Sequence, residues 1–275
     1  MEISSNSTVN QNLYLNNSQA LNRISTGLEL NSSSDNASGL GIANSLLSQA
    51  SGYSQAIENT NSAIASSQIA LSATDEQSNI LNNIKEKLLQ ASTDTTSQKG
   101  RETILKDIKS QLDQFDKIAS STNYNGQTLL QNSADDKSAS QVQQYQSGLN
   151  GENLIETSSI QSNTQGLGLT ALSSQDATSF SSSDARGFLQ SVDNAINGLN
   201  DIRSEFGSVQ NQLESSSRNL ISQEVGTLSA ASISDTDYAK ESASFSKQNI
   251  LAQIGAFSLA QGNNINQQMV SRLLS

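Results

Sequence analysis

Carboxylates are the side chains in this sequence best suited to acid–base or metal chemistry, because histidine and cysteine are both absent. Their absence excludes zinc sites of the usual kind, disulfides, cysteine nucleophiles and histidine bases. Asp35 and Asn36 stand side by side just ahead of a long apolar pattern, a placement that invites a metal or catalytic interpretation. A helix N-cap explains the pair better, since both residue types accept hydrogen bonds from the free amides at a helix start. We therefore expect no enzyme activity, no metal site and no cofactor.

The composition predicts long helices with narrow apolar stripes. Apolar residues make up 34% of the chain and aromatic residues 4%, too few for a compact core built on large side chains. Proline is absent, which removes the strongest helix breaker. The net charge of −11 argues against a nucleic-acid partner.

The N-terminal stretch MEISSNSTVNQNLYLNNSQ lacks the basic and apolar regions of a signal peptide. No apolar run reaches the ~20 residues of a transmembrane helix. We therefore expect no membrane partner and no cleavable signal peptide.

A seven-residue repeat between Ser38 and Gln90 predicts a long coiled-coil-like helix. Its apolar positions are Ala43, Ala50, Ile57, Ile64 and Leu71, flanked by further alanines that indicate a closely packed neighbouring helix. The polar stretch TDEQSN interrupts the stripe, which resumes at Ile80. After STDTTSQKG, a turn by composition, a second helix with apolar residues from Ile104 to Ile118 should fold back antiparallel on the first.

The middle of the chain, residues 132–185, is irregular and rich in serine. The stretch SQVQQYQSGLNGENLIETSSIQ alternates on both sides of LNGEN, which predicts a β-hairpin. Just before it, NYNGQ contains an Asn-Gly turn signal. A disordered serine-rich insert is the alternative for this region.

Helical periodicity returns in the C-terminal part of the chain. The seven-spaced apolar residues are Val192, Leu199, Phe206, Leu213 and Leu220, and a closing helix begins at Tyr238. The expected fold is mainly α, a long antiparallel helical bundle or coiled coil formed by both chain ends, with a small β-hairpin region between them. Residues 1–35 and the closing helix lie beyond that bundle and lack the apolar area to fold alone. They should order only when other copies cover them.

Both ends of the chain resemble the bacterial flagellins. ALNRISTGLELNSSSDNASGLGIANSL, residues 20–46, is similar to the N-terminal signature of that family, including the Ser-Thr-Gly at Ser25–Gly27 and the Asp-Asn-Ala at Asp35–Ala37. ISDTDYAKESASFSKQNILAQIGAFSLAQGNNINQQMVSRLL resembles the C-terminal signature, with Asp235, Asp237 and Tyr238 in its first motif. STNYNGQTLL matches the motif that ends the family's second helix.

The resemblance implies a minimal flagellin with the terminal coiled-coil layer, called D0, and the helical D1 layer, but without outer domains. The implied divisions are 1–37 for the N-terminal D0-like helix, 38–131 for the N-terminal arm of the D1-like bundle, 132–185 for the β-hairpin and loop region, 186–234 for the C-terminal arm, and 235–275 for the C-terminal D0-like helix. Serines and threonines within 133–185 could accept glycans in such a protein, although a plain solvated loop explains them as well.

The implied function is that of a structural subunit that polymerises into the flagellar filament for motility, outside the cell. Neighbouring copies would meet through apolar positions of the terminal helices: Leu13, Leu21, Ile24, Leu28, Tyr238, Phe245, Ile250, Ile254, Phe257, Ile265, Met269 and Leu273. The implied partners are other copies in a helical homopolymer, an export chaperone on the C-terminal region, and the filament cap and junction proteins.

Some flagellins are sensed by a Toll-like receptor through their D1 helices. The matching face here comprises Asn83, Ile84, Lys87, Leu88, Ile104 and Asp107. Asn83 stands where the family usually has its key arginine, and Lys87 replaces a leucine. Since arginine is over-represented among interface hot spots, the departure predicts weak or absent receptor recognition.

Two other functions compete with the filament subunit. A hook–filament junction protein also resembles flagellin at both ends, but the C-terminal match and the lack of a large middle domain weigh against it. A coiled-coil adaptor that never polymerises does not explain the two terminal signatures. The zinc-protease insert of some flagellins needs a His-Glu-X-X-His pair, which a chain without histidine cannot supply.

Overall fold

The computed structural model describes the backbone of residues 2–273 and the side chains of 14–232, 234–257 and 260–261. The chain forms two compact units, one from residues 1–50 with 225–275 and one from residues 51–224. The elements, in chain order, are α1 (Glu2–Thr26), α2 (Ser33–Ala91), α3 (Gln98–Ser121), β1 (Asn123–Tyr124), β2 (Gln127–Thr128), β3 (Gln144–Gln146), β4 (Leu154–Glu156), α4 (Thr170–Ser174), α5 (Ser182–Ala231), a 3-10 turn at Ser232–Ser234, and α6 (Tyr238–Leu273).

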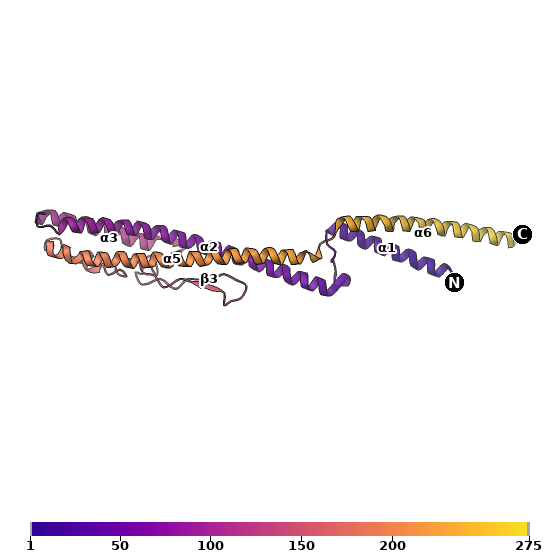
Figure 1. Cartoon of the computed structure of the whole chain (residues 1–275), viewed down its shortest axis with the longest axis horizontal. Coiled ribbons are helices and arrows are strands. Elements are labelled where there is room, and N and C mark those ends of the chain that lie inside the picture. The colour runs from indigo at the N-terminus through magenta and orange to yellow at the C-terminus, as the bar shows by residue number, and fades with distance from the viewer. Residues whose placement is uncertain (1, 274–275) are drawn as a thin grey trace. The chain divides into compact units, whose positions relative to one another are not determined.

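The unit of residues 51–224 is built on three helices, α2, α3 and α5, that lie side by side (Figure 1), and we call these helices within the unit the bundle. α3 turns back on α2 through residues 92–97, where the Ser97 side chain caps α3 by accepting from the amide of Gly100 at 3.2 Å. The largest core cluster joins Leu81 and Leu88 of α2, Ile108 of α3, and Val192 and Leu199 of α5. The mainly α fold with both arms of the chain packed together is thus confirmed.

The predicted Ala43 and Ala50 are buried, but between residues 56 and 70 the seam of α2 lies one residue earlier in the sequence than the predicted stripe. Ile57, Ile64 and Leu71 are only half-buried. The fully buried positions recur every seven residues in two rows, Ala56, Ala63, Ala70, Gln77, Ile84 and Ala91 with Thr60, Ser67, Thr74, Leu81 and Leu88. The apolar count missed this register because most of the buried residues before Leu81 are alanine or polar.

Large residues of α5 fill the space that these small residues leave. Ala63 shares a buried cluster with Val209 and Leu213, and Ala70 belongs to a second cluster that contains Phe206. The seven-spaced residues predicted for this arm, from Val192 to Leu220, are all buried. Between residues 56 and 74 of α2 the seam is therefore asymmetric, with small side chains on α2 and large ones on α5, and the close packing expected from the alanines is present.

The polar stretch TDEQSN does not interrupt α2, which continues through it. Gln77, in this stretch, has no exposed surface. Its Nε2 donates to the carbonyl of Phe115 on α3 at 3.1 Å and to the carbonyl of Ser162 at 2.7 Å. Its Oε1 accepts from the Ser162 hydroxyl at 2.8 Å. Because every polar atom of the carboxamide has a partner, the side chain is buried at little cost. It joins α2 to α3 and to the chain between α3 and α5, which we call the middle segment.

The middle segment is folded rather than a disordered insert. β3 and β4 pair antiparallel with Tyr145 opposite Ile155, which confirms the hairpin around LNGEN. The Asn-Gly turn is also confirmed: Asn125 and Gly126 join β1 to β2 with φ values of 51° and 83°, the left-handed pair that a two-residue hairpin turn requires.

Asp116 of α3 attaches this segment to the bundle. Its carboxylate accepts from the amide and hydroxyl of Thr164, at 2.8 and 2.9 Å, and from the ammonium of Lys137 at 2.6 Å. Apolar residues complete the attachment, since Leu169, Leu172 and Phe180 belong to the main core.

Candidate assembly surfaces

The unit of residues 1–50 and 225–275, which we call the terminal unit, pairs α1 with α6 (Figure 1). The Arg23 guanidinium lies 3.6 Å from the Glu241 carboxylate, and the Asn17 carboxamide donates to that of Asn249 at 3.2 Å. Because rising numbers in α1 meet falling numbers in α6, the helices are antiparallel. Neither polar pair was predicted, since polar residues between apolar stripes carry no sequence signal of their own.

The terminal unit buries small residues and exposes large ones. Among the side chains described there, the buried hydrophobic residues are all alanines: Ala20, Ala43, Ala50, Ala231 and Ala252. Its exposed large hydrophobic residues are Tyr14, Leu15, Leu21, Leu28, Ile42, Leu47, Val225, Leu228, Tyr238, Ile250, Leu251, Ile254 and Phe257. Soluble domains normally bury side chains of this size, and exposed apolar patches mark sites of association.

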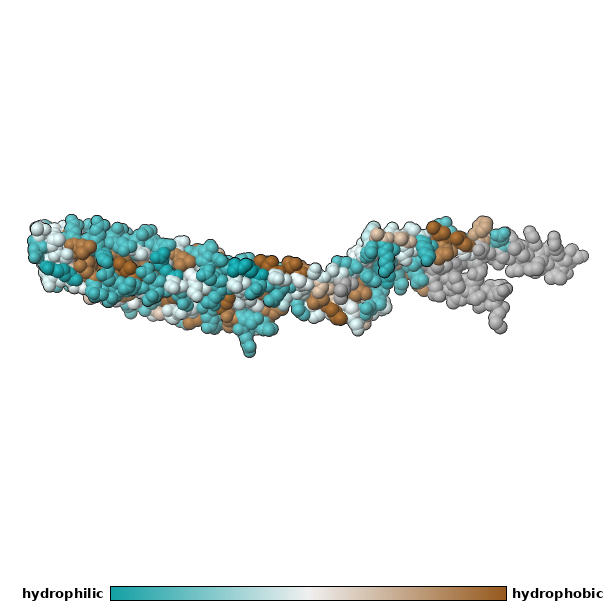
Figure 2. All heavy atoms as spheres, in the orientation of Figure 1, coloured by the Kyte–Doolittle hydropathy of each residue, from teal (hydrophilic) through white to brown (hydrophobic). Residues whose placement is uncertain are grey.

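The exposed residues form a stripe on each helix of the pair. On α6, Ile250, Ile254 and Phe257 follow the spacing i, i+4, i+7 of one helix face, with exposed fractions of 58%, 56% and 72%. On α1, Tyr14 and Leu21 are one heptad apart and 63% and 54% exposed. Figure 2 shows apolar residues at the surface along α6. Tyr14, which lies seven residues before Leu21, could have been added from spacing alone.

The structure describes the side chains of eight of the twelve residues predicted to meet neighbouring copies. Leu21, Leu28, Tyr238, Ile250, Ile254 and Phe257 are exposed. Ile24 and Phe245 are half-buried. The side chains of Leu13, Ile265, Met269 and Leu273 lie outside the described residues.

A backbone clasp joins the segments next to α1 and α6. The amide of Glu29 donates to the carbonyl of Ser234 at 2.7 Å, and the amide of Thr236 donates to the carbonyl of Gly27 at 3.0 Å. Gly27 ends α1 with a φ of 74°, a left-handed conformation that suits glycine after a helix C-terminus. The clasp therefore holds the C-terminal end of α1 next to the N-terminal end of α6.

Asp35 and Asn36 organise the start of α2, as the N-cap interpretation predicted. The amide of Gly39 donates to Asn36 Oδ1 at 2.9 Å, and Asn36 itself has non-helical backbone angles. The Asp35 carboxylate accepts from the amides of Ser32 and Asn31 at 2.9 and 3.1 Å. The backbone hydrogen bond from Ser32 has the largest effect on the pKa of Asp35 and lowers it. Desolvation comes next and opposes it, but the hydrogen bonds from Asn31 and the Ser32 hydroxyl and the charge of Arg23 also lower the pKa, so the net shift is downward.

The face predicted to meet an innate receptor is only partly at the surface. Ile84, Leu88 and Ile104 are buried in the bundle core, so the folded bundle does not present them to a receptor. Asn83 and Asp107 are exposed, and the Lys87 ammonium lies 3.2 Å from the Asp107 carboxylate. The heptad pattern already indicated that Ile84 and Leu88 are buried, because both belong to the apolar stripe that resumes at Ile80.

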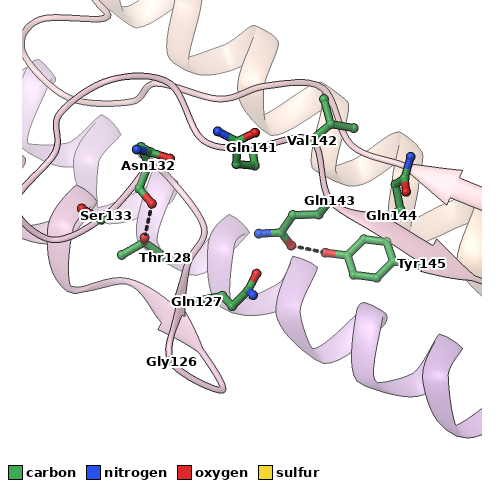
Figure 3. A pocket seen from close by; sticks show the side chains of 10 residues that line it. All are labelled: Gly126, Gln127, Thr128, Asn132, Ser133, Gln141, Val142, Gln143, Gln144 and Tyr145. Atoms are coloured by element: carbon green, nitrogen blue, oxygen red, sulfur yellow. Dashed lines mark hydrogen bonds between the residues drawn. The ribbon is translucent and has the colours of Figure 1, made fainter.

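A hollow between the β1–β2 turn and β3 is lined by uncharged side chains (Figure 3). Within it the Tyr145 hydroxyl donates to Gln143 Oε1 at 2.6 Å, and the Thr128 hydroxyl donates to the carbonyl of Asn132 at 3.0 Å. Burial raises the pKa of Tyr145. Since no side chain that lines it titrates near neutral pH, the hollow offers no general acid or base.

The described residues contain no group of three or more acidic side chains placed to hold a metal ion. In the same part of the chain, no helix combines the length and the apolar character needed to cross a bilayer.

Comparison with known proteins identifies the two arms. Residues 1–135 match the family model of the bacterial flagellin N-terminal helical region, and residues 189–274 match that of the bacterial flagellin C-terminal helical region. The flagellin of Halalkalibacterium halodurans is 30% identical over 266 residues, which cover 96% of this chain and 94% of that protein. The chain belongs to the bacterial flagellin family.

Other similarities agree with this assignment. The flagellin of Bacillus subtilis is 31% identical over 277 residues, covering 92% of this chain and 91% of that protein. A solved structure of a putative flagellar hook-associated protein from Vibrio parahaemolyticus has a TM-score of 0.58 over 72% of this chain and 98% of that one. At 12% identity, that likeness shows a shared fold only and does not favour the junction-protein alternative. Membership gives this flagellin a structural role in the extracellular flagellar filament.

Proposed function

We propose that this flagellin assembles with copies of itself through the open apolar stripes of α1 and α6, which become stably ordered when neighbouring copies cover them. The observation that carries the proposal is the inverted burial of the terminal unit, where alanines are buried and Leu21, Ile250, Ile254 and Phe257 are exposed. A helical homopolymer supplies many identical partners, because head-to-tail contacts that do not close generate filaments.

The small apolar area buried between α1 and α6 supports ordering on assembly. Burial of an alanine removes far less apolar area from water than burial of leucine or phenylalanine. Helices depend on packing of an apolar face more than on intrinsic propensity, so the pair gains little stability from Ala20 and Ala252. Covering the exposed stripes adds the apolar burial that the isolated pair lacks.

Seeded polymerisation tests this function directly. We expect long filaments from the parent chain in electron micrographs, and no filaments from a variant with Ile254→Gln and Phe257→Gln, because the substitutions remove apolar area from the α6 stripe. Lys247→Gln, an exposed position on the same helix, removes no apolar area of that kind and should polymerise normally. Filaments of normal length from the double variant would show that the stripe is not an assembly surface.

The proposal also covers the layers that the chain would form in the filament and the other proteins that would bind it. Residues 1–37 and 235–275 would form the inner terminal layer, and 38–131 with 186–234 would form the helical layer that carries the hairpin region 132–185. Before assembly, an export chaperone would bind the C-terminal region, where α6 exposes its apolar stripe. The cap and junction proteins would contact the ends of the polymer.

Weak or absent Toll-like receptor recognition follows from the residues that remain at the surface of the predicted face. Asn83 offers a carboxamide where a guanidinium would make bidentate contacts, and the Lys87 ammonium is already paired with Asp107. A receptor reporter assay should give little signal with this flagellin and more with an Asn83→Arg variant. An Asn83→Gln variant controls for side-chain length, and a strong signal from the parent chain would overturn the proposal.

A further inference from the structure

The loop of the β3–β4 hairpin contains an Asn-Gly pair in a setting that differs from those of the other two pairs in the chain. Asn150–Gly151 lies in this loop, Asn125–Gly126 forms the β1–β2 turn, and Asn197–Gly198 lies within α5. Such pairs are chemically labile, because glycine has no Cβ to hinder its amide. The glycine nitrogen attacks the asparagine Cγ, ammonia leaves, and a cyclic succinimide forms. Water then opens the ring to aspartate or isoaspartate.

Asn150–Gly151 has the exposure that this reaction needs. Both residues are exposed, and a Cβ built on Gly151 would meet no atom within 4 Å. Among the described residues, neither the Asn150 carboxamide nor the Gly151 amide takes part in a hydrogen bond. The nucleophile and the group that it attacks are therefore both unengaged.

The carboxamide of Gln146 opposes the reaction by holding the loop backbone. Its Nε2 donates to the carbonyl of Asn150 at 2.6 Å and to that of Gly148 at 2.7 Å. The amide of Asn153 also donates to the Asn150 carbonyl, at 3.0 Å. Attack needs freedom of rotation about the ψ angle of Asn150, so that the Gly151 nitrogen can reach Cγ. Bonds that fix the intervening carbonyl resist that rotation.

The other two pairs are held by their secondary structure. In α5, the amide of Gly198 is engaged within the helix and helical ψ keeps its nitrogen away from Cγ. In the β1–β2 turn, Asn125 is locked in the left-handed region with a φ of 51° by the pairing of Tyr124 with Gln127. We propose that Asn150 is a site of spontaneous deamidation to aspartate and isoaspartate, and that the Gln146 carboxamide sets its rate.

The modification would change how the hairpin loop meets the bundle. A Leu149 methyl lies where a Cβ on Gly52 of α2 would be, and the Ser216 hydroxyl of α5 donates to the carbonyl of Ser147 at 3.2 Å. Aspartate adds a negative charge close to Glu152. Isoaspartate also lengthens the backbone by one methylene. This moves the carbonyl of residue 150 away from its two donors, Gln146 Nε2 and the Asn153 amide, so the loop is held less firmly against α2 and α5.

Peptide mass mapping of the full-length chain during incubation at mildly alkaline pH tests the site. We expect conversion at Asn150 to be several-fold faster than at Asn125, and no measurable conversion at Asn197 in the same time. Isoaspartate-specific methylation of the peptide that contains residue 150 identifies the product. Conversion at Asn150 that is no faster than at Asn197 would overturn the proposal.

Two charge-matched variants test the role of Gln146. Gln146→Glu removes the donor, so conversion at Asn150 should become several-fold faster while conversion at Asn125 stays unchanged. Gln143→Glu introduces the same charge nearby and keeps the oxygen that accepts from Tyr145, so it should leave the rate at Asn150 as it is. Equal rates at Asn150 in the parent and in Gln146→Glu would show that Gln146 does not restrain the loop.

Discussion

At the residue scale, Gln77 offers the clearest test of how the middle segment is attached to the bundle. Gln77→Leu keeps the approximate size but removes both hydrogen-bonding groups, which leaves the Ser162 carbonyl and hydroxyl without partners in the core. Unsatisfied buried groups of this kind cost roughly 1–3 kcal/mol. We expect the free energy of unfolding of the bundle, measured by urea denaturation, to fall by about that amount.

Glu76→Leu is the matched control, because Glu76 is the exposed neighbour of Gln77. The control should change the free energy of unfolding by less than about 0.5 kcal/mol, as surface substitutions usually do. An unchanged stability of Gln77→Leu would mean that the carboxamide contributes nothing net to the attachment.

The lowered pKa of Asp35 predicts how the turn before α2 responds to acid. A carboxyl whose folded pKa is below its ordinary value of 3.8 stabilises the fold at higher pH, and this contribution is lost as pH falls through the folded pKa. In an NMR titration the carboxyl of Asp35 should titrate below 3.8. Protection of the Ser32 amide should decrease over the same pH range.

Asp35→Asn separates this effect from general acid sensitivity. The amide oxygen still accepts hydrogen bonds but does not titrate in this range, so protection at Ser32 should lose its dependence on pH there. A parent carboxyl that titrates at or above 3.8 would contradict the hydrogen-bonded geometry of the turn.

At the element scale, the asymmetric seam predicts that α2 accepts larger side chains only at positions outside its two buried rows. Ala63 is 1% exposed and shares a buried cluster with Val209 and Leu213. Ala63→Leu overfills that space and should destabilise the bundle by about 1–3 kcal/mol in thermal or urea unfolding. Gln68→Leu places the same side chain at an exposed position of α2 and should have little effect. Equal stabilities of the two variants would place the seam elsewhere.

The same helix shows how far sequence patterns predict the fold. Periodicity predicted a long helix and a closely packed partner, and the seven-spaced residues of α5 were all buried as expected. Between residues 56 and 70 it placed the α2 seam one residue too late, because isoleucines outweigh alanines in any apolar count. Thr60 and Thr74 sit in the true seam at little cost, since their hydroxyls donate to carbonyls of their own helix at 2.7 and 2.9 Å.

The middle segment marks the limit of what local sequence could predict. The alternation around LNGEN was enough to predict the β3–β4 hairpin, and the Asn-Gly pair was enough to predict the turn between β1 and β2. The attachment of Thr164 to Asp116 and of Ser162 to Gln77 joins residues far apart in the chain, and no local pattern indicates such pairs. For the terminal helices, spacing predicted the apolar positions but not which of them are partly covered within one chain. It therefore could not separate Ile24 and Phe245, which are half-buried, from the exposed Ile254.

At the scale of the whole molecule, the two units differ in what they bury. The bundle covers large residues such as Phe115 and Phe180 completely, whereas the terminal unit buries alanines and leaves Ile254 and Phe257 exposed. On the proposal above, the bundle is stable by itself and the terminal unit would gain its apolar burial from neighbouring copies. This division suits a subunit that has to stay unassembled until it joins a polymer.

Amide hydrogen exchange on the same full-length chain, as a dilute monomer and as a polymerised filament, tests this division most directly. The account predicts fast exchange along α1 and α6 in the monomer and strong protection of both in the filament. The core of the bundle, including Leu81 and Leu199, should be protected in both states. Equal and strong protection of α1 and α6 in the monomer would contradict the claim that these helices become stably ordered on assembly.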